Sequence, residues 1–183
     1  APTGAIIKPT AASSELMVHK GKAVVFEDHD DLAARIDDPD LEVSPEDILV
    51  MKNSGPVGAP GIPEWGFLPI PKKILATGVR DMVRLSDARM SGTAFGTVVV
   101  HVTPESANGG PLSAVRNGDM IEIDVPNRKL NLLISEDEMK SRVSEKIYEG
   151  PQFKRGFKWL HARHILQADL GCDFDFLIHE DLQ

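Results

Sequence analysis

The sequence contains a single cysteine, Cys172, among its 183 residues. One cysteine cannot form an internal disulfide, and this chain alone cannot build an iron–sulfur or metal site from cysteines only. The chain must therefore fold on its hydrophobic core. A hydrophobic content of 42% in a chain of this length is sufficient for one domain, spanning residues 1–183.

Positive charge and long apolar runs are also scarce. Lys and Arg number 20 against 28 Asp and Glu, which gives a net charge of -8. Such a chain is repelled by nucleic-acid phosphates and by anionic membranes, so neither is expected as a partner. No segment approaches the roughly 20 apolar residues that cross a bilayer, and the N-terminus lacks the residue order of a signal peptide. These absences predict a cytoplasmic protein.

Aromatic residues make up only 5% of the chain, whereas glycine and proline number 15 and 13. This composition favours short strands and turns over a helical bundle. Short apolar runs bounded by turn residues predict strands at 4–8, 22–26, 48–52, 82–86 and 97–103. Helices are expected at 29–35 and 70–77, and the acidic stretch 37–47 is expected to be a solvated connection.

The second half continues this alternation of strands and helices. Two apolar runs on either side of a turn, 121–125 and 129–134, predict an antiparallel pair. Ser135 and Glu138 match a capping box that opens a helix reaching about Tyr148. A last helix is expected from about Phe157 to Asp169. The predicted fold class is mixed α/β and strand-rich, with a barrel-like sheet and helices packed on it.

Half of the residues in segment 53–66, NSGPVGAPGIPEWG, are glycine or proline. Glycines expose backbone N–H groups and let them approach an anion closely. The only acid in the segment is Glu64, between Pro63 and Trp65, which stiffen its placement. The phosphate-binding patterns GxGxxG and GxxxxGK[ST] are absent. From its chemistry alone, a surface loop with an exposed Glu is the simpler interpretation.

A second candidate segment is 86–96, SDARMSGTAFG, which lies between two apolar strands. The hydroxyls of Ser91 and Thr93 are separated by Gly92, and Arg89 is near enough to receive a carboxylate. A serine needs a metal, a cation or a base to stabilise its alkoxide. No GxSxG elbow is present, because Arg89 stands two residues before Ser91. Considered alone, a polar turn is the simpler interpretation.

Together these segments resemble the C-terminal part of the dihydroxy-acid and sugar-acid dehydratases, a family that includes phosphogluconate, arabinonate and xylonate dehydratases. The resemblance rests on GPVGAPGIPEWG (55–66), SDARMSGTAFGTVVVHVTPE (86–105) and GGPLSAVRNGDMIEIDVPNR (109–128), in this order. Branched-chain biosynthetic members typically carry EGPKGGPGMPEM and DGRFSGGTxG in these places. The segments here, with HILQADLGCDFDFL (164–177), are more similar to the sugar-acid branch. The resemblance covers essentially the whole chain.

The resemblance implies a swivelling β/β/α domain and assigns roles to individual residues. Glu64 would be a carboxylate ligand of Mg2+. Ser91 would be the general base that removes the C2 proton of a 2,3-dihydroxy acid. Thr93 is expected in the same pocket, and Arg89 and Gly92 are expected at the substrate.

The resemblance also implies cofactors and partners. The family's [2Fe-2S] cluster, a Lewis acid for the departing C3 hydroxyl, is held by cysteines of an N-terminal domain that are missing here. Cys172 does not correspond to a cluster ligand, so the chain is expected to be the C-terminal third of a hydro-lyase and inactive alone. One Glu with waters makes a weak Mg2+ site. Expected partners are a sugar-acid substrate, the N-terminal domain and further copies in a homo-oligomer.

The remaining histidines and tryptophans receive structural interpretations. His161 and His164 lie three apart on a predicted helix, but no neighbouring ligands complete a metal set, so a structural or surface role is expected. His101, inside an apolar strand, is expected to be a hydrogen-bonded core residue. Trp65 borders the proposed metal loop and would shield it, and Trp159 is expected to pack its helix.

The tail carries alternating residues. Cys172 is expected to be a buried or partly buried thiol without a partner. Asp173 and Asp175 alternate with Phe174 and Phe176, a pattern typical of a half-buried strand or a docking segment.

Three alternatives to a sugar-acid dehydratase domain stay open. They are a dihydroxy-acid dehydratase of branched-chain biosynthesis, a non-catalytic sugar-acid or anion-binding module, and the mobile small domain of an aconitase-like isomerase. The presence of both Glu64 and Ser91 favours a hydro-lyase, because a mere binder needs neither a hard-metal ligand nor a base. Which aldonic acid is dehydrated stays open.

Overall fold

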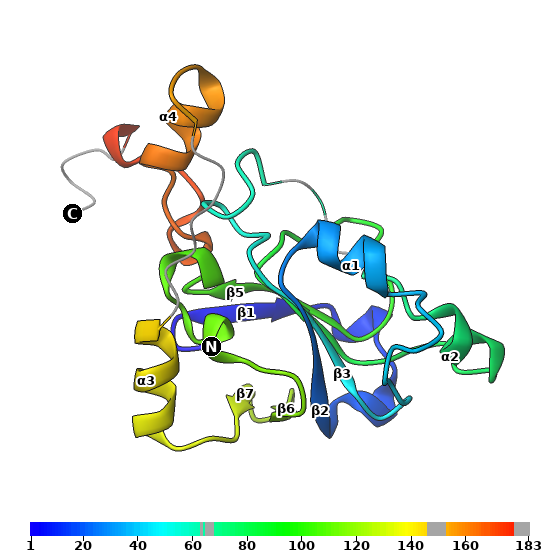
Figure 1. The fold of residues 1–183 in the computed structure, drawn as a ribbon. Helices are drawn as coiled ribbons and strands as arrows, with labels where there is room; N and C mark the ends of the chain where they lie inside the picture. The colour runs from blue at the N-terminus through cyan, green and yellow to red at the C-terminus, as the bar shows by residue number, and fades with distance from the viewer. Residues whose placement is uncertain (63, 65–67, 146–152, 178–183) are drawn as a thin grey trace.

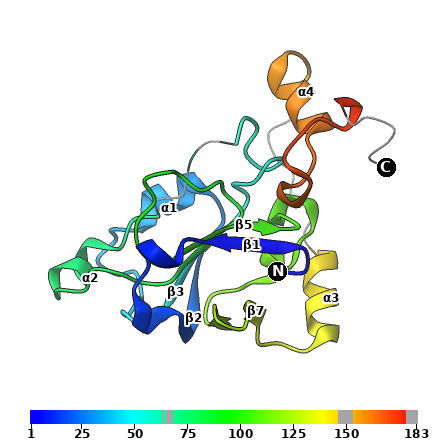
Figure 2. The ribbon, with the colours of Figure 1, turned by 180° about the vertical axis from the view of Figure 1, so that it is seen from behind.

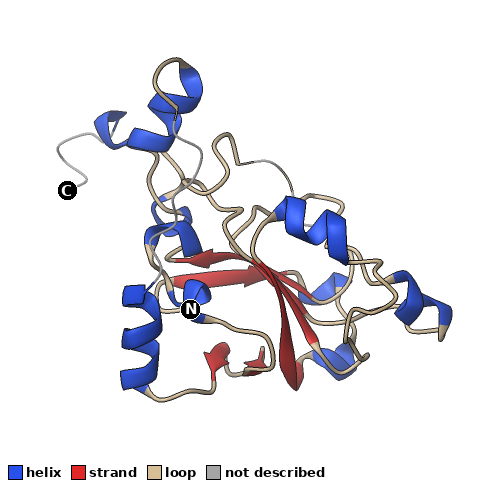
Figure 3. Cartoon of the chain, in the orientation of Figure 1, coloured by secondary structure: helices blue, strands red, loops and turns tan. Residues whose placement is uncertain are grey.

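The computed structural model describes residues 1–62, 64, 68–145 and 153–177. Its strands form one mixed sheet, and its helices lie outside the sheet (Figures 1 and 3). The strands are β1 Gly4–Ile7, β2 Val18–Phe26, β3 Ile48–Met51, β4 Arg84–Ser86, β5 Val98–Thr103, β6 Met120–Asp124 and β7 Lys129–Leu132. The helices are α1 His29–Arg35, α2 Lys72–Ala76, α3 Glu136–Glu145 and α4 Phe157–His164.

The sheet has the strand order β1-β5-β4-β3-β2-β6-β7. Its four central strands, β2 to β5, are parallel, while β1, β6 and β7 are antiparallel to their neighbours. The sheet curls into a half-barrel, which confirms the expected mixed α/β class with a barrel-like sheet (Figure 3). The N-terminal amino group, just ahead of β1, donates to the carbonyl of Leu130 in β7 at 3.2 Å, so the two sheet edges approach each other.

Apolar side chains cover both faces of the central strands. The four residues of β3 are buried on both sides, as expected for a parallel strand in an α/β sheet. All seven strands contribute to the inner cluster, which includes Val25, Val50, Leu85, Val99 and Ile123, with Ile7 and Leu130 packed against it. The outer cluster joins Phe26, Leu49 and Met51 to α1 and α2 through Leu32, Ile36 and Ile74.

Several local predictions are confirmed at the level of single hydrogen bonds. Helix α1 has the predicted bounds, because the Asp28 side chain caps it by accepting the N–H of Asp31 at 2.9 Å. Helix α3 follows Ser135, whose hydroxyl accepts the N–H of Glu138 at 3.2 Å. The predicted end of that helix, Tyr148, lies outside the described residues.

Other boundaries differ from the prediction. Strand β2 begins at Val18 rather than Lys22, because its first half pairs with β6. Helix α4 ends at His164 rather than Asp169, because Ile165 is extended and pairs with Phe174 in an isolated antiparallel bridge. The predicted tail strand is reduced to that bridge, and a short 3-10 turn follows it.

The segment 37–47 is mostly exposed, which confirms a solvated connection. Within the described parts of the chain, no helix has the length and apolar character needed to cross a membrane.

A buried ion pair connects β4 to the residues just before β5. Arg84 of β4 is 2% exposed, and its Nη2 lies 3.0 Å from Asp81 Oδ1. Asp81 also accepts the N–H and the hydroxyl of Thr97 at 2.9 and 2.7 Å, and Arg84 donates to the carbonyl of Phe95 at 3.1 Å. Because both charges are buried, removing either partner would leave the other uncompensated.

Gly96 lies beside this ion pair with a positive φ, a backbone conformation that favours glycine. Replacing it tests how much the ion pair contributes to stability. The φ of Gly96 is +88°, and a Cβ there would overlap the Arg84 guanidinium. Gly96→Ala is therefore expected to lower the free energy of unfolding by about 3 kcal/mol, measured by urea denaturation of the chain.

Gly92→Ala is the matched control, because no atom lies within 4 Å of its Cβ position. We expect it to change the free energy of unfolding by less than about 0.5 kcal/mol. Equal losses in the two variants would contradict this account of the ion pair.

Candidate active site

The candidate residues lie on loops that leave the carboxyl ends of parallel strands. Strand β3 leads into the Gly/Pro loop with Glu64, and β4 leads into the loop with Ser91. In parallel α/β sheets, the carboxyl ends meet at one edge, where ligands usually bind. The neighbouring order of β3 and β4 therefore brings the two predicted segments together.

The two loops touch through their main chains. Glu64 and Arg89 form an isolated parallel bridge, and the Arg89 Nε donates to the carbonyl of Ile62 at 2.8 Å. Arg89 thus braces the Glu64 loop with one of its nitrogens. Its predicted contact with a substrate carboxylate stays a prediction.

The Ser91 hydroxyl is hydrogen-bonded to Thr93 of its own loop. Ser91 is 7% exposed, and its Oγ accepts the N–H of Thr93 at 3.0 Å and lies 2.9 Å from Thr93 Oγ1. Lys8, just after β1, donates from Nζ to the carbonyl of Gly92 at 2.8 Å and to that of Ser91 at 3.4 Å. The sequence gives no local signal for Lys8, because 83 residues separate it from Ser91.

His101 holds the start of the same loop. Its main-chain N–H donates to the carbonyl of Ala88 at 2.9 Å, and its ring Nε2 accepts the main-chain N–H of Met90 at 2.9 Å. Burial and the nearby Arg89 charge lower the pKa of His101, which favours the neutral ring that can accept this bond. The expected hydrogen bonding of His101 is confirmed, but its placement in the core is not, because the residue is only partly buried.

The N–H groups of the Gly/Pro loop bind an internal anion, the carboxylate of Glu105. This residue follows β5 and is 1% exposed. Its two oxygens accept the N–H of Val57 at 2.9 and 3.1 Å, and one accepts that of Gly58 at 3.0 Å. A Cβ at Gly55 would lie 2.5 Å from Glu105 Oε2, so this approach requires glycine.

A second buried carboxylate, Asp87, follows β4 at the same edge. Its two oxygens accept the N–H groups of Ser54 and Ser106, each at 2.8 Å. Burial raises the pKa of Asp87 to about 6, with a smaller contribution from the charge of Glu105. Burial also raises the pKa of Glu105. The sequence interpretation missed both acids, although Asp87 directly follows β4 and Glu105 follows β5 after Pro104.

The C-terminal segment contacts these loops at two points. His161 of α4 is buried, and the N–H of Gly61 lies 3.3 Å from its Nε2. Gln167 accepts the N–H of Glu105 at 2.8 Å and donates to Glu105 Oε1 at 2.6 Å. The structural role expected for His161 is confirmed, and Gln167 was not singled out from the sequence.

Other tail expectations have mixed outcomes. His164 lies 3.0 Å from Asp175, so its role is structural. Cys172 is partly buried as expected, and burial raises the pKa of its thiol. The expectation that Trp159 packs its helix is wrong, because its ring is 42% exposed and meets the His164 ring of the same helix edge-on. Trp65 lies outside the described residues.

The donor set fits one ligand of a hard metal ion. The described residues contain no group of three or more His, Cys, Asp or Glu side chains that could hold a metal. Glu64 is exposed on the loop, so its carboxylate is free to supply one oxygen to Mg2+, which prefers oxygen ligands. The single thiol of Cys172, with its raised pKa, does not fit an iron–sulfur cluster.

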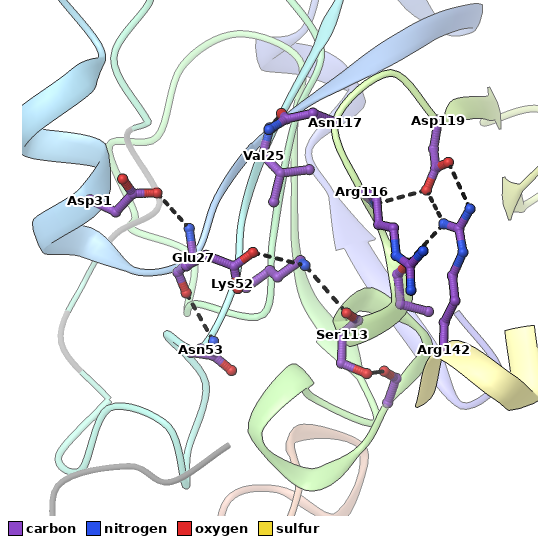
Figure 4. A network of polar contacts seen from close by, with 12 residues as sticks. Val25, Glu27, Asp31, Lys52, Asn53, Ser113, Arg116, Asn117, Asp119 and Arg142 are labelled. Carbon is purple, nitrogen blue, oxygen red and sulfur yellow. Dashed lines mark hydrogen bonds and ion pairs between the residues drawn. The ribbon is translucent and has the colours of Figure 1, made fainter. Parts of the chain in front are cut away.

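Two cavities lie away from Glu64 and Ser91. One of about 810 Å³ lies between β2 and the acidic segment 37–47. Another of about 250 Å³ lies at the ends of β2 and β3, where buried Lys52 donates to the Ser113 carbonyl at 3.3 Å and lies 3.5 Å from Glu27 (Figure 4). Neither of these two cavities is lined by Glu64 or Ser91.

Comparisons with known proteins agree on one family. The model of the dihydroxy-acid/6-phosphogluconate dehydratase C-terminal domain matches residues 1–172. An L-arabinonate dehydratase of Rhizobium leguminosarum bv. trifolii is 55% identical over 97% of this chain and 31% of its own length. A 6-deoxy-6-sulfo-D-gluconate dehydratase of Pseudomonas putida is 51% identical over 96% of this chain and 30% of its own.

A dihydroxy-acid dehydratase of Carboxydothermus hydrogenoformans is more distant, with 34% identity over 95% of this chain and 31% of its own length. The chain therefore spans about a third of the length of these relatives.

The raised pKa of Asp87 predicts a specific pH dependence of stability. The folded pKa of about 6 lies above the ordinary 3.8, so the folded state holds this proton more tightly. The contribution of Asp87 to stability is therefore present below pH 4 and is lost as pH rises through 6. The unfolding free energy of the wild type relative to Asp87→Asn should fall by about 2 kcal/mol from pH 4 to pH 7.

Urea denaturation at four pH values between 4 and 7 measures this difference. Asp40→Asn, on the exposed connection, is the control for changing an acid elsewhere. A wild-type advantage over Asp87→Asn that stays constant across this range would refute the assignment.

Proposed function

Because the chain belongs to the dihydroxy-acid/6-phosphogluconate dehydratase family, we propose that it is the catalytic C-terminal domain of a hydro-lyase that dehydrates a sugar acid. The observation that carries this proposal is the contact between the two loops. The loop of a buried serine with donors around its hydroxyl lies against the loop of an exposed carboxylate.

The substrate class follows from the degree of similarity. The relatives above 50% identity are named for arabinonate and for 6-deoxy-6-sulfo-D-gluconate, whereas the dihydroxy-acid dehydratase is 34% identical. We therefore place the substrate among the aldonic acids, which carry hydroxyls on C2 and C3. The product would be the 2-keto-3-deoxy acid.

Ser91 is the proposed base of this reaction. Its Oγ takes the C2 proton, the C2–H electron pair forms a C2=C3 double bond, and the C3–O bond breaks. The departing C3 hydroxyl takes a proton from solvent and leaves as water, and Ser91 returns its proton to solvent. The resulting enol loses its O–H proton and gains one at C3, which gives the C2 ketone. The N–H and the hydroxyl of Thr93, at 3.0 and 2.9 Å, support this role because both can donate to a Ser91 alkoxide.

Lys8 would add positive charge at the Ser91 loop through its bonds to the carbonyls of Gly92 and Ser91. Gly92 is exposed, and no atom lies within 4 Å of its Cβ position, so a substrate could approach its main chain. Arg89, which keeps further guanidinium donors beside its bond to Ile62, is the proposed partner of the substrate carboxylate.

Glu64 is the proposed protein ligand of Mg2+ on this chain. The metal would supply positive charge that stabilises the negative charge developing next to the substrate carboxylate. A single carboxylate binds Mg2+ weakly, so the remaining ligands would come from the N-terminal domain. The [2Fe-2S] cluster would belong to that domain as well.

The site needs the rest of the enzyme in this proposal. The described residues offer no group of three metal-ligating side chains, which suits a site completed by an N-terminal domain. Further copies in a homo-oligomer would complete the assembly.

Replacement of the base is the first test. In the full-length enzyme, Ser91→Ala should lower kcat by at least about 10³ and leave the fold unchanged, because the proton acceptor is lost. The assay follows 2-keto-3-deoxy product from a panel of aldonic acids, with a branched 2,3-dihydroxy acid for comparison. Ser14→Ala, in a surface turn, is the control. Near-normal turnover of Ser91→Ala would exclude Ser91 as the base.

Metal binding is tested separately at Glu64. Glu64→Gln keeps the size of the side chain but removes its charge, so we expect the Kd for Mn2+, used in place of Mg2+, to rise about tenfold or more. Electron paramagnetic resonance of free Mn2+ in the full-length protein measures this Kd. Exposed Glu46 provides the control Glu46→Gln. An unchanged titration for Glu64→Gln would remove Glu64 from the ligand set.

A further inference from the structure

We propose that Glu105 and Gln167 are positioning residues that fix the Glu64 loop from the C-terminal segment. This inference rests on the proposed function, because it concerns the placement of the proposed Mg2+ ligand. Its basis is a continuous set of hydrogen bonds from Gln167 through Glu105 to Val57 and Gly58.

The Glu64 loop has little means of holding its own shape. Its internal main-chain bonds are turns, from Ala59 N–H to the Gly55 carbonyl and from Ile62 N–H to the Ala59 carbonyl, both at 2.9 Å. A Cβ at Gly58 would lie 2.7 Å from the Asn53 carbonyl oxygen, so side chains cannot fill this space. Contacts from outside the loop must therefore fix it.

Glu105 supplies the main external contact. Both of its carboxylate oxygens face the loop and accept the N–H groups of Val57 and Gly58. Hydrogen bonds to an ionised acceptor are stronger than neutral ones, and burial excludes competing water. The main chain of Glu105 is itself fixed, since its carbonyl accepts the N–H of Gly110 at 2.8 Å.

Gln167 sets the direction of that carboxylate. Its Oε1 accepts the Glu105 N–H and its Nε2 donates to Glu105 Oε1, so one amide grips both the main chain and the side chain. The main chain of Gln167 is fixed as well, because its carbonyl accepts the N–H of Cys172 at 3.1 Å. The position of the C-terminal segment therefore determines the position of the Gly/Pro loop, through Gln167 and Glu105.

The path to Glu64 is short. Gly61 is held beside His161 of the same segment, and Ile62 is held by Arg89. Residues 57, 58, 61 and 62 are thus all held, and the main chain of Glu64 pairs with Arg89, so the backbone that carries the Glu64 carboxylate is anchored. Mg2+ demands near-ideal octahedral geometry, so a displaced loop would weaken its binding without removing any ligand.

Gln167→Met tests the connection, because methionine has a similar length but cannot make either bond. In the full-length protein, we expect the Kd for Mn2+ to rise about 3- to 10-fold. In the metal-free protein, amide hydrogen exchange of the peptide containing residues 53–62 should be at least about threefold faster. Asp175→Asn is the control, because it breaks a pair with His164 that lies inside the tail.

Exchanging the side chains of Glu105 and Gln167 shows whether their hydrogen bonds, rather than their size, fix the loop. In Glu105→Gln, the new NH2 must face either the loop N–H groups or the Gln167 NH2, and both are donors. In the double variant Glu105→Gln, Gln167→Glu, the NH2 of residue 105 meets a carboxylate and its oxygen faces the loop. We expect the double variant to recover most of the Mn2+ affinity lost in Glu105→Gln.

The outcomes are distinguishable from those for the base and the metal ligand. Wild-type Mn2+ affinity and amide exchange in Gln167→Met would overturn the positioning role, and so would a double variant no better than Glu105→Gln. If Glu105→Gln does not fold, Gln167→Met decides alone. If Glu64→Gln binds Mn2+ normally, the proposed ligand fails, while faster exchange in Gln167→Met would still establish the connection to the loop.

Discussion

The carboxyl edge of this sheet depends on two buried carboxylates that are satisfied by main-chain N–H groups. Asp87 joins the start of the Gly/Pro loop to the turn after β5, and Glu105 holds the middle of that loop. Burying two acids so close together is costly, as the raised pKa of Asp87 reflects. In return, the two acids fix the Gly/Pro loop, which has few side chains that could pack and hold it in place.

The two neighbouring loops are held in different ways. The loop after β3 is fixed from outside and presents Glu64 on its exposed side. The loop after β4 is fixed from within, through the hydroxyl and N–H of Thr93 around Ser91 and through His101 at its start. Because β3 and β4 are adjacent and parallel, the loops that carry Glu64 and Ser91 lie against each other although 27 positions separate these two residues.

The sequence was most informative where structure is local. The apolar run of β3, the bounds of α1 and the capping box at Ser135 depend on residues a few positions apart, and they are found as predicted. The end of α4 was misjudged, because the pairing of Ile165 with Phe174 overrides helix propensity. Glu105 and Gln167 could not be paired in advance, since 62 residues and the curl of the sheet separate them.

The two terminal segments of the described chain each contact one of these loops. Strand β1 runs beside β5 (Figure 2), and Lys8, the residue after β1, donates to the Ser91 loop. Gln167, in the segment after α4, binds Glu105, which in turn holds the Gly/Pro loop. The loops are therefore not independent modules. A chimera that borrows the Gly/Pro loop of a relative would need residues 105 and 167 from the same donor, and a transplanted Ser91 loop would need the first strand.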